Sequence, residues 1–193
     1  TTSRPVVTAD LSEDVLGDPE ACSTGGGLDA AARRHVDGDP TGYFFLEIFA
    51  GSARLSKSLE KQLTLIGKSD VKIIRIDVRN GAMDDILRSE CFLRIQRLVN
   101  SGRCLGVWMA PPCSTWSTSR RNDGHRATPL RSPDHVMGLP NLSDNDYMKV
   151  REANDMVDRS YKIAINCILN RVPFAIENPF HSMIWDEGNL KSL

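Results

Sequence analysis

The chain has 193 residues, of which 40% are hydrophobic and 25% are charged, a composition typical of a globular domain and unlike that of collagen-like or low-complexity chains. No apolar run approaches the roughly 20 residues of a transmembrane helix and no signal peptide follows Thr1, so we expect no membrane segment and an intracellular location, nuclear in a eukaryote. The odd number of cysteines, with no close pair, argues against a disulfide framework and a Cys-x-x-Cys zinc site, so no metal site is expected.

Charge is distributed unevenly along the chain. The net charge is −1, but residues 1–40 hold eight acidic side chains against three arginines, so the remainder is mildly basic. Residues 1–40 also contain Gly25-Gly26-Gly27 and show no sustained periodicity, which is typical of a disordered linker. We therefore predict a flexible acidic, glycine-rich extension over 1–40 and a folded domain over 41–193, whose charge is compatible with nucleic acid.

Strand and helix patterns alternate in the folded part. The run 43–49 is aromatic and nearly continuous, like a buried strand, and Ser52 is a good N-cap for a helix that ends at Gly67. Strands are predicted at 43–49, 71–77, 104–109 and 172–177, and helices at 52–67, about 87–101 and about 145–170. This alternation implies right-handed crossovers and a parallel sheet, so the fold class is α/β with a Rossmann-like, mostly parallel sheet.

The first candidate site lies at the turn after the first strand. Phe49-Ala50-Gly51-Ser52 leads into a helix whose free N–H groups could face a ligand, and Asp77 closes the next strand, where an acid can hold ribose hydroxyls. Only one glycine stands where dinucleotide sites use three. This pattern alone therefore does not separate nucleoside binding from an ordinary turn.

The second candidate is the cysteine after the third strand. The strand stops at Pro111-Pro112, so Cys113 is delivered to the rim of the sheet, beside several hydroxyl side chains. A thiolate there could act as a nucleophile, although a buried free cysteine is a common alternative. Cys91, Cys104 and Cys167 fall on apolar faces, and we interpret them as structural.

Two further segments belong to the same rim. Glu177-Asn178 follows the last strand, and a parallel sheet brings its carboxylate to the edge that holds Gly51, Asp77 and Cys113. The polar stretch after Cys113 is long for a compact domain and rich in basic side chains, which favours a flap that meets phosphates over a merely solvated loop. Its arginines are Arg120, Arg121, Arg126 and Arg131.

Together these segments resemble the cytosine-C5 DNA methyltransferase family, over roughly residues 43–185. The segments occur in the family's order: Phe49-Ala50-Gly51 as cofactor loop, Asp77 as ribose-binding acid, Pro112-Cys113-Ser114-Thr115-Trp116-Ser117 as Pro-Cys motif and Glu177-Asn178 as Glu-Asn motif. The amino-acid sequence of several segments between Leu130 and Trp185 is similar to that of a divergent branch of this family found in phages and mobile elements.

The resemblance implies an S-adenosylmethionine-dependent enzyme acting on DNA. Cys113 would add to C6 of a flipped-out cytosine, Glu177 would interact with N3, and C5 would take the methyl group. Phe49, Ala50, Gly51, Ser52, Asp77 and Pro112 would bind the cofactor, and Ser117, Arg120, Arg121 and Asn178 would bind the DNA substrate.

The chain also departs from that family. The glutamine that usually follows the catalytic cysteine is Ser114, and Ser52-Ala53-Arg54 replaces further glycines in the cofactor loop. The Gln-x-Arg-x-Arg motif, the recognition domain and the final Asn-Gly motif are not found, and only about four strands can be counted. We therefore expect an incomplete catalytic domain, either part of a longer polypeptide or completed by a partner chain.

Three other interpretations remain open from the sequence. The domain could be catalytically inactive and serve as a nucleic-acid-binding or assembly module. Pro111-Pro112 or Asn178-Pro179-Phe180 partly matches the motif of amino-methyltransferases, which would leave Cys113 without a role. A cysteine hydrolase is the weakest alternative, because no histidine has a context that ties it to Cys113.

Overall fold

The computed structural model of the chain describes residues 40–120 and 128–193. The flexible extension predicted over 1–40 and the candidate substrate residue Arg121 therefore lie outside the described residues, apart from residue 40 itself. The elements in chain order are β1 (Phe44–Ile48), α1 (Arg54–Leu65), β2 (Lys72–Ile76), the 3₁₀ turns η2 (Val78–Asn80) and η3 (Ala82–Asp84), α2 (Ser89–Val99), β3 (Cys104–Met109), α3 (Asp144–Leu169), β4 (Phe174–Ile176), η4 (Met183–Asp186) and α4 (Gly188–Lys191). The α/β class predicted from the sequence is confirmed.

The four strands form one parallel sheet in the order β2-β1-β3-β4. The last residue of β1, Ile48, is in register with Ile76 of β2 and with Met109 of β3, so the strands end level with one another. The chain leaves β1 toward β2 on one side and later crosses back to β3 on the other. Connections that diverge in this way open a crevice at the carboxyl ends of the central strands, where α/β proteins bind ligands.

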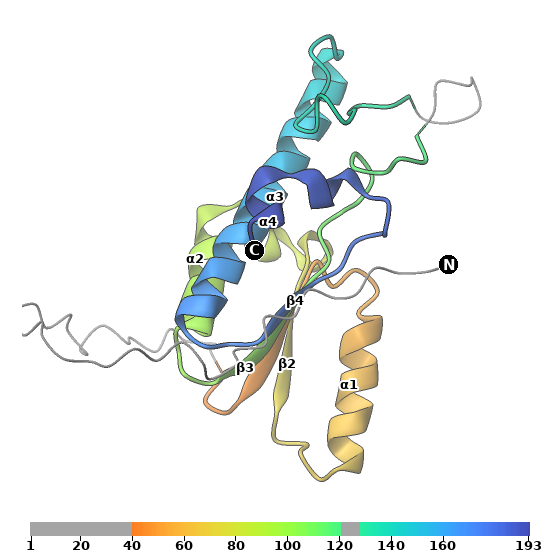
Figure 1. Cartoon of the computed structure of the whole chain (residues 1–193). Helices are drawn as coiled ribbons and strands as arrows, with labels where there is room; N and C mark the ends of the chain where they lie inside the picture. The colour runs from red at the N-terminus through yellow and green to blue at the C-terminus, as the bar shows by residue number, and fades with distance from the viewer. Residues whose placement is uncertain (1–39, 121–127) are drawn as a thin grey trace, which may run out of the picture.

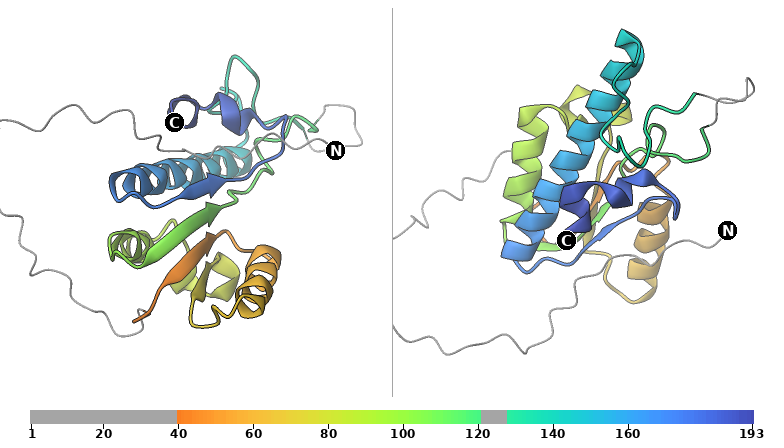
Figure 2. Two further views of the ribbon diagram at one scale, coloured as in Figure 1. Left: turned by 60° about the horizontal axis from the view of Figure 1, so that its bottom comes forward. Right: turned by 45° about the horizontal axis from the view of Figure 1, so that its top comes forward.

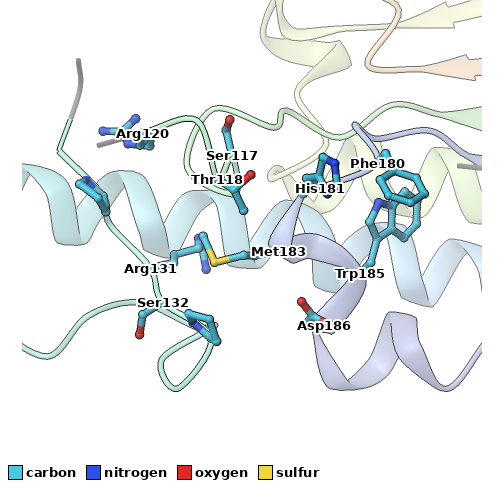
Figure 3. A pocket seen from close by; sticks show the side chains of 13 residues that line it. Ser117, Thr118, Arg120, Arg131, Ser132, Phe180, His181, Met183, Trp185 and Asp186 are labelled. Atoms are coloured by element: carbon cyan, nitrogen blue, oxygen red, sulfur yellow. The ribbon is translucent and has the colours of Figure 1, made fainter. Parts of the chain in front are cut away.

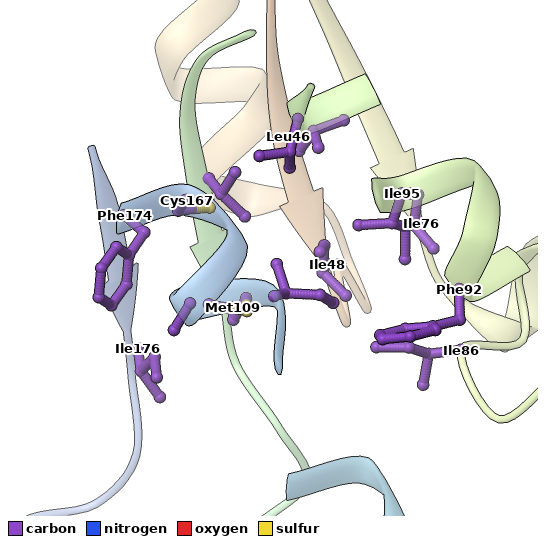
Figure 4. Packing of buried hydrophobic residues seen from close by; sticks show 14 of the residues in the cluster. Leu46, Ile48, Ile76, Ile86, Phe92, Ile95, Met109, Cys167, Phe174 and Ile176 are labelled. Carbon is purple, nitrogen blue, oxygen red and sulfur yellow. The ribbon is translucent and has the colours of Figure 1, made fainter. Parts of the chain in front are cut away.

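Helices cover the two faces of the sheet unequally. Helices α2 and α3 lie together on one face and α1 lies on the other (Figures 1 and 2). The main core fills the α2/α3 face, where each strand contributes fully buried aliphatic side chains (Figure 4). Its members include Leu46, Ile48, Ile76, Ile95, Met109, Cys167, Phe174 and Ile176. On the α1 face an apolar hollow of about 270 Å³ remains over β1, β3 and β4.

The N-terminus of α1 is capped in a way the sequence did not indicate. The prediction that Ser52 is the N-cap is wrong: the N-cap position is Ala53, which has a left-handed φ of 54° and no side-chain cap. Glu47, buried in β1, instead accepts hydrogen bonds from the backbone N–H of Ser56 (3.1 Å) and from the Ser56 hydroxyl. A carboxylate at this end also interacts favourably with the helix dipole, so a strand residue replaces the local cap.

The remaining boundaries agree with the sequence prediction to within a few residues. The second helix begins at Ser89, so Leu87 precedes it, and the last strand contains only residues 174–176. In the polar stretch after Cys113, the described residues up to α3 form no named strand, but isolated bridges join Ser117 to Ser182 and Ser132 to His135. Within the described residues, no helix has the length and apolar character needed to cross a membrane.

Candidate functional site at the carboxyl edge of the sheet

Three predicted cofactor-binding residues line one small pocket at the carboxyl edge. Phe49 follows β1, Asp77 follows β2 and Pro112 follows β3, and all three contribute to a pocket of about 170 Å³. Because these residues come from three separate strand ends, the parallel topology and not sequence proximity brings them together. Ala50, Gly51 and Ser52, which were predicted with them, are not part of its lining.

The turn after β1 is held by backbone hydrogen bonds in an unusual conformation. Phe49, Gly51 and Ala53 all have positive φ (61°, 52° and 54°), a region that residues with a Cβ rarely occupy. The N–H groups of Phe49 and Ala50 donate to the Ile76 carbonyl at 2.8 and 3.3 Å, which ties the turn to the end of β2. The strained turn is therefore fixed to the neighbouring strand.

Asp77 connects this turn to the pocket. One carboxylate oxygen accepts the N–H of Gly51 (2.7 Å) and the other accepts the N–H of Arg79 (2.9 Å). Each oxygen keeps further acceptor capacity, because an ionised carboxylate offers about four lone-pair positions. Asp77 therefore both shapes the turn and could accept hydrogen bonds from a ligand's hydroxyl groups.

Sequence reasoning missed the residues that complete this pocket. They come from the 3₁₀ turns after β2 and from α3, and include Val78, Arg79, Asp84, Asp85, Ile86 and Met156. Asp84 is paired with Arg94 at 2.9 Å, and Asp85 accepts the N–H of Leu87 at 3.0 Å. The signal available in the sequence is the mixture of acidic and apolar residues over 78–86, directly after the predicted strand 71–77. Met156 gave no signal, because its place depends on how α3 lies across the sheet.

Cys113 differs from the other described cysteines in its surroundings. It is a free, half-exposed thiol in the segment after β3, directly after Pro112 of the small pocket. Burial raises the pKa of Cys91 and Cys104 to about 11 and that of Cys167 to about 12, which keeps these three thiols protonated and unreactive at neutral pH. The interpretation of those three as structural is supported, and Cys113 remains the accessible candidate nucleophile.

The Glu-Asn segment lies against the segment that carries Cys113. The Glu177 N–H donates to the Met109 carbonyl (2.8 Å), and the buried Asn178 side chain donates from Nδ2 to the Pro111 carbonyl (2.8 Å). The Oδ1 atom of Asn178 is buried without a hydrogen-bond partner. Asn178 therefore fixes the Pro-Pro turn through its Nδ2 atom.

The other predicted substrate residues lie beside a second, larger hollow. Ser117 and Arg120 are part of the lining of an open pocket of about 700 Å³ between the segment after Cys113 and the C-terminal segment (Figure 3). Arg120 braces its own segment by donating to the carbonyls of Thr128 (2.8 Å) and Ser114 (3.1 Å). Aromatic side chains, including Phe180 and Trp185, form the opposite wall, a combination that suits a nucleotide chain.

The position of Arg131 does not fit the interpretation of this segment as a basic flap that meets phosphates. Its side chain is only 2% exposed and is surrounded by neutral acceptors. It donates to the carbonyls of Val136 and Val150, to Asn154 Oδ1 and to Thr115 Oγ1, and its guanidinium lies 3.3 Å from the ring centroid of Trp116. Burial lowers the pKa of Arg131 to about 10. Arg131 is therefore a structural cation that organises the segment and is not an exposed phosphate contact.

Comparison with known proteins adds no family assignment: no family model, curated protein or solved structure matches the chain. Among the residues that the structure describes, no group of three or more His, Cys, Asp or Glu side chains could hold a metal ion. The function of the chain is therefore inferred from the geometry of the carboxyl edge of its sheet.

Proposed function

We propose that this chain is the catalytic part of an S-adenosylmethionine-dependent cytosine-C5 DNA methyltransferase, with a methyltransferase-type Rossmann fold. The observation that carries the proposal is the common pocket of Phe49, Asp77 and Pro112, the residue before Cys113. The parallel topology brings three strand ends to one edge, and these three residues share a pocket there. That shared pocket supports a role in binding a cofactor next to a nucleophile.

The small pocket has the chemistry that an adenosyl group requires. Asp77 offers acceptor positions for ribose hydroxyls, while Phe49, Ile86 and Met156 offer apolar surface to a base. S-adenosylmethionine would supply the methyl group. The Gly51 N–H is already bonded to Asp77, so the turn acts through the shape it gives the pocket and not through a free donor.

The residues near Cys113 can perform the remaining steps on the base. The Cys113 thiolate adds through Sγ to C6 of an extruded cytosine, which makes C5 nucleophilic. Glu177 interacts with N3 and stabilises the charge that develops during attack. Asn178 holds the turn before Cys113, and the hollow lined by Ser117 and Arg120 receives the flanking DNA. C5 would then take the methyl group, with S-adenosylhomocysteine as the leaving group. A base would remove the C5 proton, and the electron pair of that C–H bond would restore the C5–C6 double bond and expel Cys113 Sγ, which releases the methylated base and the thiolate.

One observation favours a second function, an inactive methyltransferase-like module that binds nucleic acid or assembles with a partner. The small pocket holds about 170 Å³, whereas small-molecule sites typically enclose roughly 300–1,000 Å³. Full enclosure of the cofactor would then need further walls from another segment or partner chain. A module that binds no cofactor would not need these further walls, so the small volume of the pocket suits it.

The deciding experiment mixes the protein with S-adenosylmethionine and duplex DNA that contains 5-fluorocytosine. A base can remove the C5 hydrogen as a proton, but fluorine at C5 cannot leave as a cation. The elimination that frees the cysteine is therefore blocked, and an active enzyme is trapped as a covalent protein–DNA adduct. We expect an adduct for the wild type, none for Cys113→Ala, and an unchanged yield for the buried-cysteine control Cys104→Ala. A folded wild type that binds DNA but forms no adduct and binds no cofactor would favour the inactive module.

A further inference from the structure

The candidate acid has a side-chain partner that no motif contains. Trp108 is the fifth residue of β3, and Glu177 directly follows β4. Trp108 is in register with Ala175, so Glu177, two residues further on, projects from the same face of the sheet. The Trp108 Nε1–H donates to Glu177 Oε2 at 3.3 Å.

Both ends of this hydrogen bond are held in place. Trp108 is held at its backbone in β3, between β1 and β4, and its half-buried ring lines the apolar hollow of the α1 face with Leu105, Pro173 and Ala175. Glu177 is fixed at its backbone by the bond to the Met109 carbonyl. A tryptophan side chain has two rotatable bonds, so little entropy is lost when it holds a donor in one position.

The indole is the only side chain among the described residues that contacts the Glu177 carboxylate by a hydrogen bond. With the residues that the structure describes, Glu177 forms no ion pair and its Oε1 atom accepts no hydrogen bond. The exposed carboxylate would otherwise be free to rotate about its side-chain bonds. A neutral donor restrains it without adding a counter-charge.

We propose that Trp108 is a positioning residue for Glu177: it holds Oε2 through its indole N–H and leaves Oε1 to meet the substrate base. This inference rests on the proposed function of Glu177. A displaced carboxylate should lower the rate of attack on cytosine and leave cofactor binding unchanged, because Trp108 is not part of the small pocket. Misplacement of a reacting group by about 1 Å can cost on the order of 100-fold in rate.

Trp108→Phe removes the donor and keeps an aromatic ring in the hollow. Phe45→Leu is the control, because Phe45 is another aromatic residue that lines the same hollow and its change removes no hydrogen-bond donor. We expect adduct formation with 5-fluorocytosine DNA to slow about 10- to 100-fold in Trp108→Phe and to change less than about threefold in Phe45→Leu.

A double-mutant cycle separates positioning from a general structural effect. If Trp108 acts through Glu177, Trp108→Phe should cause no further loss in a Glu177→Gln background, whereas a structural defect would add to it. An equal or faster rate in Trp108→Phe, or fully additive losses, would overturn the inference and leave the proposed function intact. A wild type that forms no adduct would overturn both.

A spectroscopic readout tests the hydrogen bond without relying on activity. The three tryptophans give three indole N–H signals in a ¹⁵N–¹H spectrum, and Trp108→Phe identifies which belongs to Trp108. Glu177→Gln should shift that signal and leave those of Trp116 and Trp185 in place. An unmoved signal would show that the indole does not hold the carboxylate.

Discussion

The two halves of the candidate site are held in place by different means. The cofactor half, at the ends of β1 and β2, is fixed mainly by its backbone: a turn with three positive φ angles is bonded to the Ile76 carbonyl and to Asp77. The half that carries Cys113 is fixed by side chains, namely Arg131 and Asn178. A backbone-held region should be sensitive to changes in φ, and a side-chain-held region to the loss of single polar groups.

The largest expected effect is the loss of the buried cation in the Cys113 half. Arg131→Met would leave Thr115 Oγ1, Asn154 Oδ1 and two backbone carbonyls without their donor. Buried groups left unpaired cost about 1–3 kcal/mol each, so we expect the free energy of unfolding to fall by roughly 3 kcal/mol after partial relaxation. Urea denaturation measures it. Arg120→Met, which removes a half-exposed arginine of the same segment, should cost less than about 1 kcal/mol. Equal losses in the two variants would contradict the assignment of a structural role to Arg131 alone.

The next largest effect concerns the acid of the cofactor half. Asp77→Asn keeps the shape but removes the charge that accepts the Gly51 and Arg79 N–H groups and, as proposed, the ribose hydroxyls. Hydrogen bonds to charged groups contribute about 1.5–3 kcal/mol, so affinity for S-adenosylmethionine should fall roughly 10- to 100-fold by calorimetry. Asp155→Asn, an exposed change on α3, serves as control. Unchanged affinity in Asp77→Asn would place the cofactor elsewhere.

Substitution of two glycines distinguishes the effect of the turn's shape on cofactor affinity from a general effect on stability. Gly51 (φ 52°) and Gly67 (φ 72°) both have left-handed backbones and room for a Cβ, but only Gly51 belongs to the turn of the cofactor half. Either Gly→Ala change should cost about 1–2 kcal/mol of folding free energy through the strained φ. Cofactor affinity should fall only in Gly51→Ala, since its relaxation moves Phe49 and Asp77. Equal affinity in both variants would show that the turn does not shape the pocket.

Local patterns predicted the strands and the edge at which the candidate residues meet. Buried strands such as β1 and β3 are continuous apolar runs, and parallel topology then places Phe49, Asp77 and Pro112 at one edge. These inferences needed only the order of elements along the chain.

The features that sequence could not predict are contacts between distant segments. Glu47 caps α1 only because β1 runs beneath that helix, and Met156 reaches the pocket only through the tilt of α3. Arg131 lies between Leu130 and Ser132 in a stretch without helix or strand periodicity, so no local pattern indicates its burial. In each case the role is created by tertiary packing, which local propensity does not encode.

The smallest effect concerns a buried thiol of the core and is expected only at high pH. Burial raises the pKa of Cys167 to about 12 from an ordinary value of 9. Between these values the folded state retains a proton that the unfolded state has lost, so the free energy of unfolding should fall as pH rises above 9 and should be unaffected below it. Cys167→Ala removes this contribution, at the cost of a small cavity, and should flatten the decline between pH 9 and 11 in urea titrations. Ile163→Val, which trims the core on the same helix without removing a thiol, should leave the slope as in the wild type. If Ile163→Val flattened the slope as much as Cys167→Ala, the decline would not come from the Cys167 thiol.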